Sequence, residues 1–161
     1  QSLKITGQID IVDFKFMKTM TKLSALNLKE VKIIKRVDEY GHESAEDAIP
    51  ESAFNIIDNN VPRLFNLILP DNLKTIGGSA FASQSLSGSL IIPEGVKEIG
   101  DKAFVYCSNL KGTLSLPYTL EKIGACAFSG CGFTCELLLP QNLKSLGSEA
   151  FGYVNRTVST L

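Results

Sequence analysis

The feature that most constrains the fold is a motif that recurs four times at a nearly constant spacing. Its prolines are separated by 23, 24 and 23 residues, and a glycine and a phenylalanine keep the same intervals. The three sets are Pro70, Pro93, Pro117 and Pro140; Gly77, Gly100, Gly124 and Gly147; and Phe81, Phe104, Phe128 and Phe151. A fixed period of this length is typical of stacked-repeat proteins, so the sequence predicts a solenoid.

Each repeat contains two segments with the pattern of short β-strands. The first, as in SLIIP, alternates apolar and other residues and ends at a proline, which cannot donate to a sheet ladder. The second, as in VKEIG, ends at a glycine, for which we expect a positive φ at the corner of the coil. The Ala-Phe segment that follows is expected to form a 3-10 or helical turn with the phenylalanine at the centre. One unit buries too little apolar surface to fold alone, so we expect the units to stack with parallel strands.

The whole chain, residues 1–161, is predicted to be a single domain in three parts. Residues 1–40 form a cap-like first unit, 41–68 an irregular repeat with an inserted loop, and 69–161 the regular repeats. In the cap, DFKFMKTMTKL is predicted to be a helix between two strands, with Phe14, Met17 and either Met20 or Leu23 facing the core. The polar segment VDEYGHESAEDA is interpreted as a solvated loop.

The two chain ends suggest a processed chain or a fragment. The sequence begins at Gln1 without methionine or a signal segment, and the last repeat stops before its proline. Arg156 stands near the position of a core leucine in earlier repeats, so the C-terminal unit is either a polar cap or, as we favour, part of an array truncated at this point. Asn155 begins a glycosylation sequon by sequence only.

The repeat resembles that of a known family. The spacings IPxxVxxIGxxAFxxC at residues 92–107 and LPxxLxxIGxxAFxxC at 116–131 are similar to the BspA-like, type-5 leucine-rich repeats of bacterial proteins. This resemblance implies an α/β leucine-rich-repeat solenoid that is curved and carries a sheet along one face. It also implies a secreted or cell-surface bacterial protein built for adhesion or protein binding, exported by a signal or lipid anchor that is absent from this chain.

Four cysteines lie in the C-terminal half of the chain, at positions 107, 126, 131 and 135. Their spacing is not that of a paired zinc motif, and His42 is the sole histidine, so buried thiols are favoured over a metal site. A disulfide stays open, because equivalent positions in adjacent units are about 5 Å apart and Cys107 and Cys131 are equivalent. Gln84 and Val154 replace the cysteine in the neighbouring repeats.

Charge and motif content argue against two classes of function. Sixteen basic and seventeen acidic residues give a net charge of −1, without the basic stripe that nucleic-acid binding needs. Histidine-based catalysis would have to use His42 in the charged loop, and no nucleotide-binding or metalloprotease motif occurs in the sequence. We therefore predict a protein that is not an enzyme and that has no cofactor.

The outward positions of the first strand are the predicted partner-binding residues. They form two columns across the stack: Asn66, Ser89, Thr113 and Glu136; and Ile68, Ile91, Ser115 and Leu138. The second column is largely apolar, which favours a protein partner on a host or bacterial surface, although strand propensity alone also places such residues there. A glycan partner is less favoured because the chain has no tryptophan. The alternative function is a spacer or self-association domain of a larger surface protein.

Overall fold

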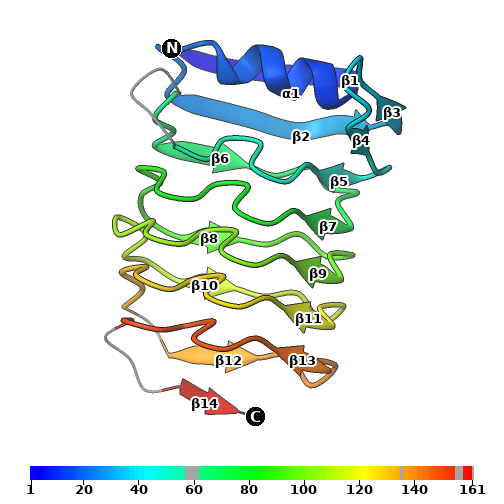
Figure 1. Ribbon diagram of the computed structural model, residues 1–161. Coiled ribbons are helices and arrows are strands. Elements are labelled where there is room, and N and C mark those ends of the chain that lie inside the picture. The colour runs from blue at the N-terminus through cyan, green and yellow to red at the C-terminus, as the bar shows by residue number, and fades with distance from the viewer. Residues whose placement is uncertain (57–61, 135, 155–157, 161) are drawn as a thin grey trace.

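The computed structural model describes residues 1–56, 62–134, 136–154 and, for the backbone alone, 158–160. The chain coils into a stack of rungs that runs from a single short helix at one end to β14 at the other (Figure 1). Within the described residues, no helix is long and apolar enough to cross a membrane. The expected solenoid of short parallel strands is confirmed, with a period of 23 or 24 residues.

Each regular rung has two strand-bearing sides and one turn side. We call the side that carries the first strand of each repeat the first-strand side: β6 (Asn66–Ile68), β8 (Leu90–Ile91), β10 (Leu114–Ser115) and β12 (Leu137–Leu139). The second-strand side carries β5 (Ala48–Ile49), β7 (Thr75–Ile76), β9 (Glu98–Ile99), β11 (Lys122–Ile123) and β13 (Ser145–Leu146). These last five strands form one parallel sheet in the order β13-β11-β9-β7-β5.

The phenylalanines of the repeats form one internal file, as predicted. From Phe54 to Phe151, neighbouring rings stack with centroids 5.3–5.8 Å apart and planes within 14° of parallel. Phe14 of the helix closes the file with an edge contact to Phe54 at 6.1 Å. Stacked rings at this spacing match the separation of strands in a sheet, so each rung sets its phenylalanine directly over that of the next.

The expectation of a positive φ at the repeat glycines is wrong. The left-handed conformation falls two residues later, at Ser79, Lys102, Cys126 and Glu149. The glycines are needed because rungs approach closely there: a Cβ on Gly124 would lie 2.4 Å from the backbone nitrogen of Asp101. The Ala-Phe segments on the turn side form hydrogen-bonded turns, such as that from the N–H of Ala103 to the carbonyl of Gly100.

The N-terminal unit covers one end of the stack (Figure 1). The strands β1 (Ser2–Ile9) and β2 (Ala25–Ile33) pair in parallel, and β2 continues the pairing to β6. The helix α1 (Ile11–Lys18) begins with a capping box formed by Asp10 and Asp13, and it buries Phe14 and Met17 as predicted. It is shorter than expected, because the chain turns at Thr19; Leu23 is fully packed and Met20 partly so.

The segment predicted to be a solvated loop is instead largely an ordered insertion. An antiparallel hairpin of β3 (Arg36–Val37) and β4 (Glu43–Ser44) lies beside α1. Asp38 is buried and accepts hydrogen bonds from Lys15 and from the backbone N–H groups of Tyr40 and His42, at 2.8 and 2.9 Å. Burial alone would raise the pKa of this carboxyl, but its hydrogen bonds, first that from Lys15, hold the pKa well below its usual value.

The equivalent cysteines of adjacent rungs, Cys107 and Cys131, are each hydrogen-bonded to the backbone of the rung before. The thiols of Cys107 and Cys131 are buried and free, and each donates to the carbonyl of the phenylalanine one rung earlier, Phe81 or Phe104, at 3.2 Å. Burial raises the pKa of the Cys131 thiol to about 12 and holds that of Cys107 well above its usual value. These contacts agree with the predicted buried thiols; Cys135, Asn155 and Arg156 lie outside the described residues.

Candidate binding surfaces

The predicted apolar column lies on the surface of the first-strand side. Ile68, Ile91 and Leu138 are 43%, 69% and 48% exposed, and we call these three residues the apolar strip. Ser115 is also exposed and pairs with Ile91 across β8 and β10. Above the strip, Asn27 of β2 pairs with Ile68. The strip therefore crosses several rungs without a charged side chain in its own column between β2 and β12.

The other predicted column runs beside the strip and is polar. Asn66, Ser89, Thr113 and Glu136 are all exposed. The Ser89 hydroxyl accepts hydrogen bonds from the backbone N–H and the hydroxyl of Thr113, at 3.0 and 3.1 Å. These small groups can form hydrogen bonds to a partner that packs on the strip.

The first-strand side is interrupted next to the strip. Its strands form the groups β1-β2-β6, β10-β8 and β12-β14 (Val158–Thr160), so among the described residues no ladder joins β6 to β8. A hollow of about 260 Å³ lies at this break and is lined by Phe65, Asn66 and Ser89 together with five neighbours. This break could not be predicted from the sequence, because the segments that form β6 and β8 have the same alternating pattern.

A buried side chain connects two rungs close to this break. Gln84 donates to the carbonyls of Phe54 and Pro62, at 2.5 and 3.0 Å, and accepts from the N–H of Leu64 at 2.6 Å. Phe54 is the phenylalanine one rung earlier, so Gln84 makes the same type of contact as the cysteines of later rungs. Gln84 departs from the cysteine pattern of the sequence, but its side chain makes the hydrogen bond that cysteine makes in the later rungs.

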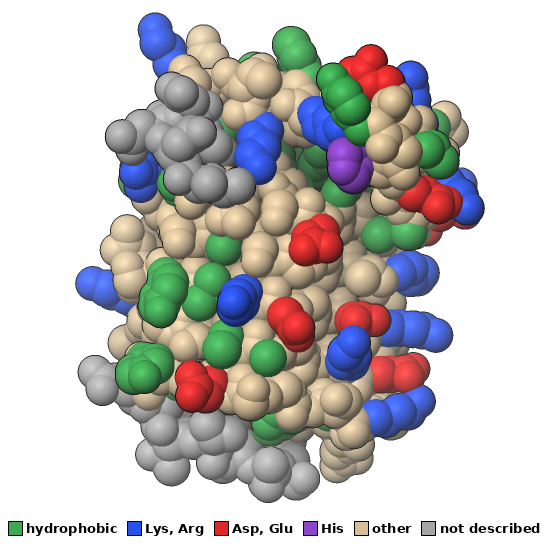
Figure 2. All heavy atoms as spheres, in the orientation of Figure 1, with side chains coloured by type: hydrophobic (Ala, Val, Ile, Leu, Met, Phe, Trp, Pro, Cys, Tyr) green, Lys and Arg blue, Asp and Glu red, His purple; other side chains and the backbone are tan. Residues whose placement is uncertain are grey.

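The second-strand side carries a different surface. Lys122 pairs with Glu98 at 2.7 Å, and Lys144 pairs with Glu121 at 2.6 Å, each across two adjacent rungs. Basic and acidic side chains interleave along this edge of the molecule (Figure 2). This mixture of charges on Lys74, Lys97, Lys144, Glu98 and Glu121 makes this a well-solvated face.

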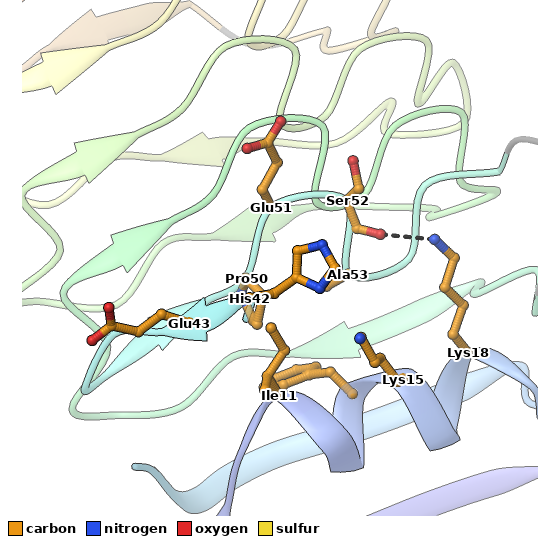
Figure 3. Close-up of a pocket in the computed structure, with 10 residues that line it drawn as sticks. Ile11, Lys15, Lys18, His42, Glu43, Pro50, Glu51, Ser52 and Ala53 are labelled. Carbon is orange, nitrogen blue, oxygen red and sulfur yellow. Dashed lines mark hydrogen bonds between the residues drawn. The ribbon is translucent and has the colours of Figure 1, made fainter. Parts of the chain in front are cut away.

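A cavity lies outside both columns, between α1, the hairpin and the turn at residues 50–53. It has a volume of about 400 Å³. Its lining consists of Ile11, Phe14, Lys15, Lys18, His42, Glu43, Pro50, Glu51, Ser52 and Ala53. In Figure 3 the ammonium groups of Lys15 and Lys18 and the ring of His42 point toward the space between helix and turn. Sequence reasoning missed this cap pocket because it treated residues 37–48 as a loop.

His42 is held by the hairpin itself. Its Nδ1 lies 3.0 Å from the Oδ2 of Asp38. The other oxygen of this carboxylate, Oδ1, accepts a hydrogen bond from the backbone N–H of His42. Ser52 lines the opposite wall of the pocket, and its carbonyl accepts a hydrogen bond from Lys18 at 3.0 Å. The Asp38–His42 pair therefore has a clear role in folding the insertion and in shaping the pocket wall.

Comparison with known proteins identifies the repeats. Residues 2–111 and 47–160 match the BspA type leucine rich repeat region, with six copies. The chain belongs to this family. Members of the BspA-type family are often surface proteins and are typically non-catalytic. The comparison with curated proteins gave no match.

Three solved structures are similar to this BspA-type chain. They are a leucine-rich repeat protein from Bacteroides capillosus ATCC 29799 (23% identity, TM-score 0.47), the pneumococcal vaccine antigen PcpA (21%, 0.53) and a leucine-rich repeat protein from Bacteroides ovatus ATCC 8483 (28%, 0.49). They cover 79%, 90% and 86% of this chain, which in turn covers 72%, 35% and 32% of theirs. The chain therefore spans about a third of the length of the latter two.

Proposed function

We propose that this chain is an extracellular or cell-surface binding module that holds a protein partner on its first-strand side. The observation that carries the proposal is the apolar strip, three large aliphatic side chains exposed in one column. Isolated exposed apolar residues are ordinary, whereas three large ones in a single column, interrupted here only by Ser115, favour a contact surface for a partner.

The neighbouring surfaces support this choice of side. The polar column beside the strip can supply the hydrogen bonds that surround an apolar contact, whereas the second-strand side has ion pairs that keep it hydrated. A net charge of −1 and a family whose members are often surface proteins favour a protein partner over nucleic acid. A glycan is a weaker candidate, because the chain has no tryptophan.

The test is the double variant Ile91→Asp with Leu138→Asp. Two carboxylates in the strip are expected to abolish partner binding and to leave the fold intact, because both side chains already face water. The chain, immobilised by one terminus, is exposed to extracellular proteins of bacterial or host origin, and specifically retained proteins are identified and titrated. Circular dichroism and thermal unfolding report the fold.

The matched control carries the same total charge change on the other side, as Lys97→Gln with Lys144→Gln. A partner retained by the native chain and by the control, but lost from the strip variant, supports the proposal. Equal retention by all three chains contradicts it. If the native chain instead dimerises in solution and the strip variant is monomeric, self-association by way of the strip is the function.

A further inference from the structure

We propose that the cap pocket is a second binding site, which takes a carboxylate carried on a small apolar group. The site is independent of the apolar strip. It is formed by the two parts of the chain that depart from the repeat, the helix α1 and the inserted hairpin, together with the first Ala-Phe turn. Its volume of about 400 Å³ lies in the range of small-molecule sites.

The floor of the cap pocket is apolar. Ile11 and Phe14 from the helix and Ala53 from the turn are buried core residues whose exposed edges line the cavity, and Pro50 completes this part of the wall. A floor of this kind gains affinity from a hydrocarbon group, at about 25 cal/mol for each Å² of apolar surface removed from water. It offers little to a fully hydrated ion.

The polar part of the wall is cationic. Lys15 and Lys18 lie one turn apart on the same face of α1, and both ammonium groups point toward the pocket (Figure 3). The two carboxylates of the lining point away from it, and that of Glu43 is paired with Lys35. An anionic group is therefore the complement of this wall, and a carboxylate accepts the N–H donors of an ammonium.

The cationic groups are already held in place. Lys15 is fixed by its ion pair with buried Asp38 and lies 5.1 Å from the centre of the Tyr40 ring. Lys18 donates a hydrogen bond to the carbonyl of Ser52 at 3.0 Å, which holds its ammonium group at the pocket wall. Arg36 fixes the hairpin to the helix start by an ion pair with Asp10 at 2.7 Å. Groups that are ordered before binding lose less entropy when a ligand arrives.

The probes are N-acetyl-leucine and N-acetyl-leucinamide, which share the apolar group and differ in the carboxylate. Titration of the full chain is followed by the amide ¹H–¹⁵N shifts of residues 11–18 and 50–54. We expect saturable shifts with the acid and binding at least about tenfold weaker with the amide, the size of one lost charge-assisted hydrogen bond. Equal affinities, or no saturable shift with either probe, would overturn the proposal.

Two variants and a control separate the site from general charge effects. Lys18→Met keeps the hydrocarbon stem and should weaken binding of the acid about tenfold, whereas Lys18→Arg keeps the charge and should restore most of it. Lys22→Met removes an exposed charge that does not line the pocket and should leave binding unchanged. If Lys22→Met weakens binding as much as Lys18→Met, attraction is non-specific and the site is refuted.

A last pair of probes distinguishes the source of the carboxylate. The peptide Ala-Ala-Leu with a free C-terminus is compared with N-acetyl-leucine and with its own amide. Tighter binding of the free peptide assigns the site to peptide C-termini, and tighter binding of N-acetyl-leucine assigns it to small carboxylates; both outcomes support the shared chemistry. The strip variant Ile91→Asp with Leu138→Asp should bind the acid normally, so failure of either site can be told from failure of the other.

Discussion

The two strand-bearing sides of the solenoid come from the same repeats, yet they pair their backbones and display their side chains differently. The second-strand side is one sheet of five parallel strands, β13-β11-β9-β7-β5. The first-strand side is divided into three separate groups of strands. The continuous side carries charged residues in inter-rung pairs, and the divided side carries the apolar strip.

The difference shows how close backbone approach is encoded. On the second-strand side, β7, β9, β11 and β13 are each followed by a glycine whose added Cβ would lie 2.2–2.6 Å from the preceding rung, so a side chain there would force the rungs apart. On the first-strand side, β8 and β10 pair, and there Gly112 is equally crowded against Ser89. Where β6 and β8 fail to pair, Gly88 has open space around it. Tight glycines thus coincide with continuous pairing.

The largest effect is expected from Gly124→Ala. Its new methyl group would meet the backbone of Asp101, which cannot rotate away, so we expect a loss of roughly 4 kcal/mol in the free energy of unfolding, or loss of the folded protein. Urea unfolding of the variant measures this. The matched change Gly88→Ala has open space and costs only the strain of a left-handed alanine, about 1 kcal/mol. Equal costs would refute the contrast between the two sides.

Gln84→Leu tests the buried hydrogen bonds that connect two rungs close to the break. The change leaves the N–H of Leu64 and the carbonyls of Phe54 and Pro62 without their side-chain partner in a buried site, so we expect a loss of roughly 3 kcal/mol in urea unfolding. Ser87→Ala is the control, since it removes an exposed hydrogen bond to Phe65 from the same region. A Gln84→Leu variant as stable as Ser87→Ala would show that these hydrogen bonds do not stabilise the fold near the break.

Hydrogen exchange should show, without any mutation, which side has the more stable backbone hydrogen bonds. The N–H of Gly100 bonds to the carbonyl of Ile76 at 2.8 Å within the continuous side, whereas the N–H of Ser87 reaches Phe65 at 3.1 Å beside the break. We expect the amide of Gly100 to exchange at least about tenfold more slowly than that of Ser87 in native-state measurements by NMR. Slower exchange at Ser87 than at Gly100 would contradict the prediction that the first-strand side is the more weakly paired.

The smallest effect concerns the inter-rung ion pairs. The hydrogen bond and charge of Lys144 lower the pKa of Glu121, so the ionised carboxylate stabilises the fold above the usual glutamate pKa. This contribution is lost as the pH falls through the lowered pKa in the folded state. Glu121→Gln should therefore flatten slightly the acid side of a plot of unfolding midpoint against pH. Because the pair is exposed, 0.5 M salt should remove the difference.

The sequence predicted most of the fold because the fold is periodic. The shared spacing of proline, glycine and phenylalanine predicted the length of each rung. Alternation in SLIIP and its equivalents predicted which side chains are buried, so Ile68, Ile91 and Leu138 were placed correctly on the surface. The glycines were found for the wrong reason, since periodicity reveals that a position matters but not which contact requires it. Their role depends on atoms of another rung.

The parts that sequence reasoning missed are non-periodic. The hairpin at Arg36–Ser44 has the charged composition of a loop, and its order depends on one buried carboxylate, Asp38, whose partners come from α1 and from its own turn. The cap pocket depends on this hairpin and was therefore missed with it. The Asp38–His42 pair is visible in the sequence, but it occurs once in a polar segment. Without recurrence at a fixed period, nothing in the sequence marks it as a structural contact.

The contact made by Gln84 has a consequence for recognising distant relatives. A comparison of residue types counts glutamine in a cysteine column as a mismatch, yet both side chains donate a hydrogen bond to the equivalent phenylalanine carbonyl of the rung before. What the three rungs of this chain share in that column is the hydrogen-bonded carbonyl oxygen, not the sulfur. Repeat detection that groups residues by the hydrogen-bond acceptor they contact should find rungs in sequences that have diverged from the consensus motif.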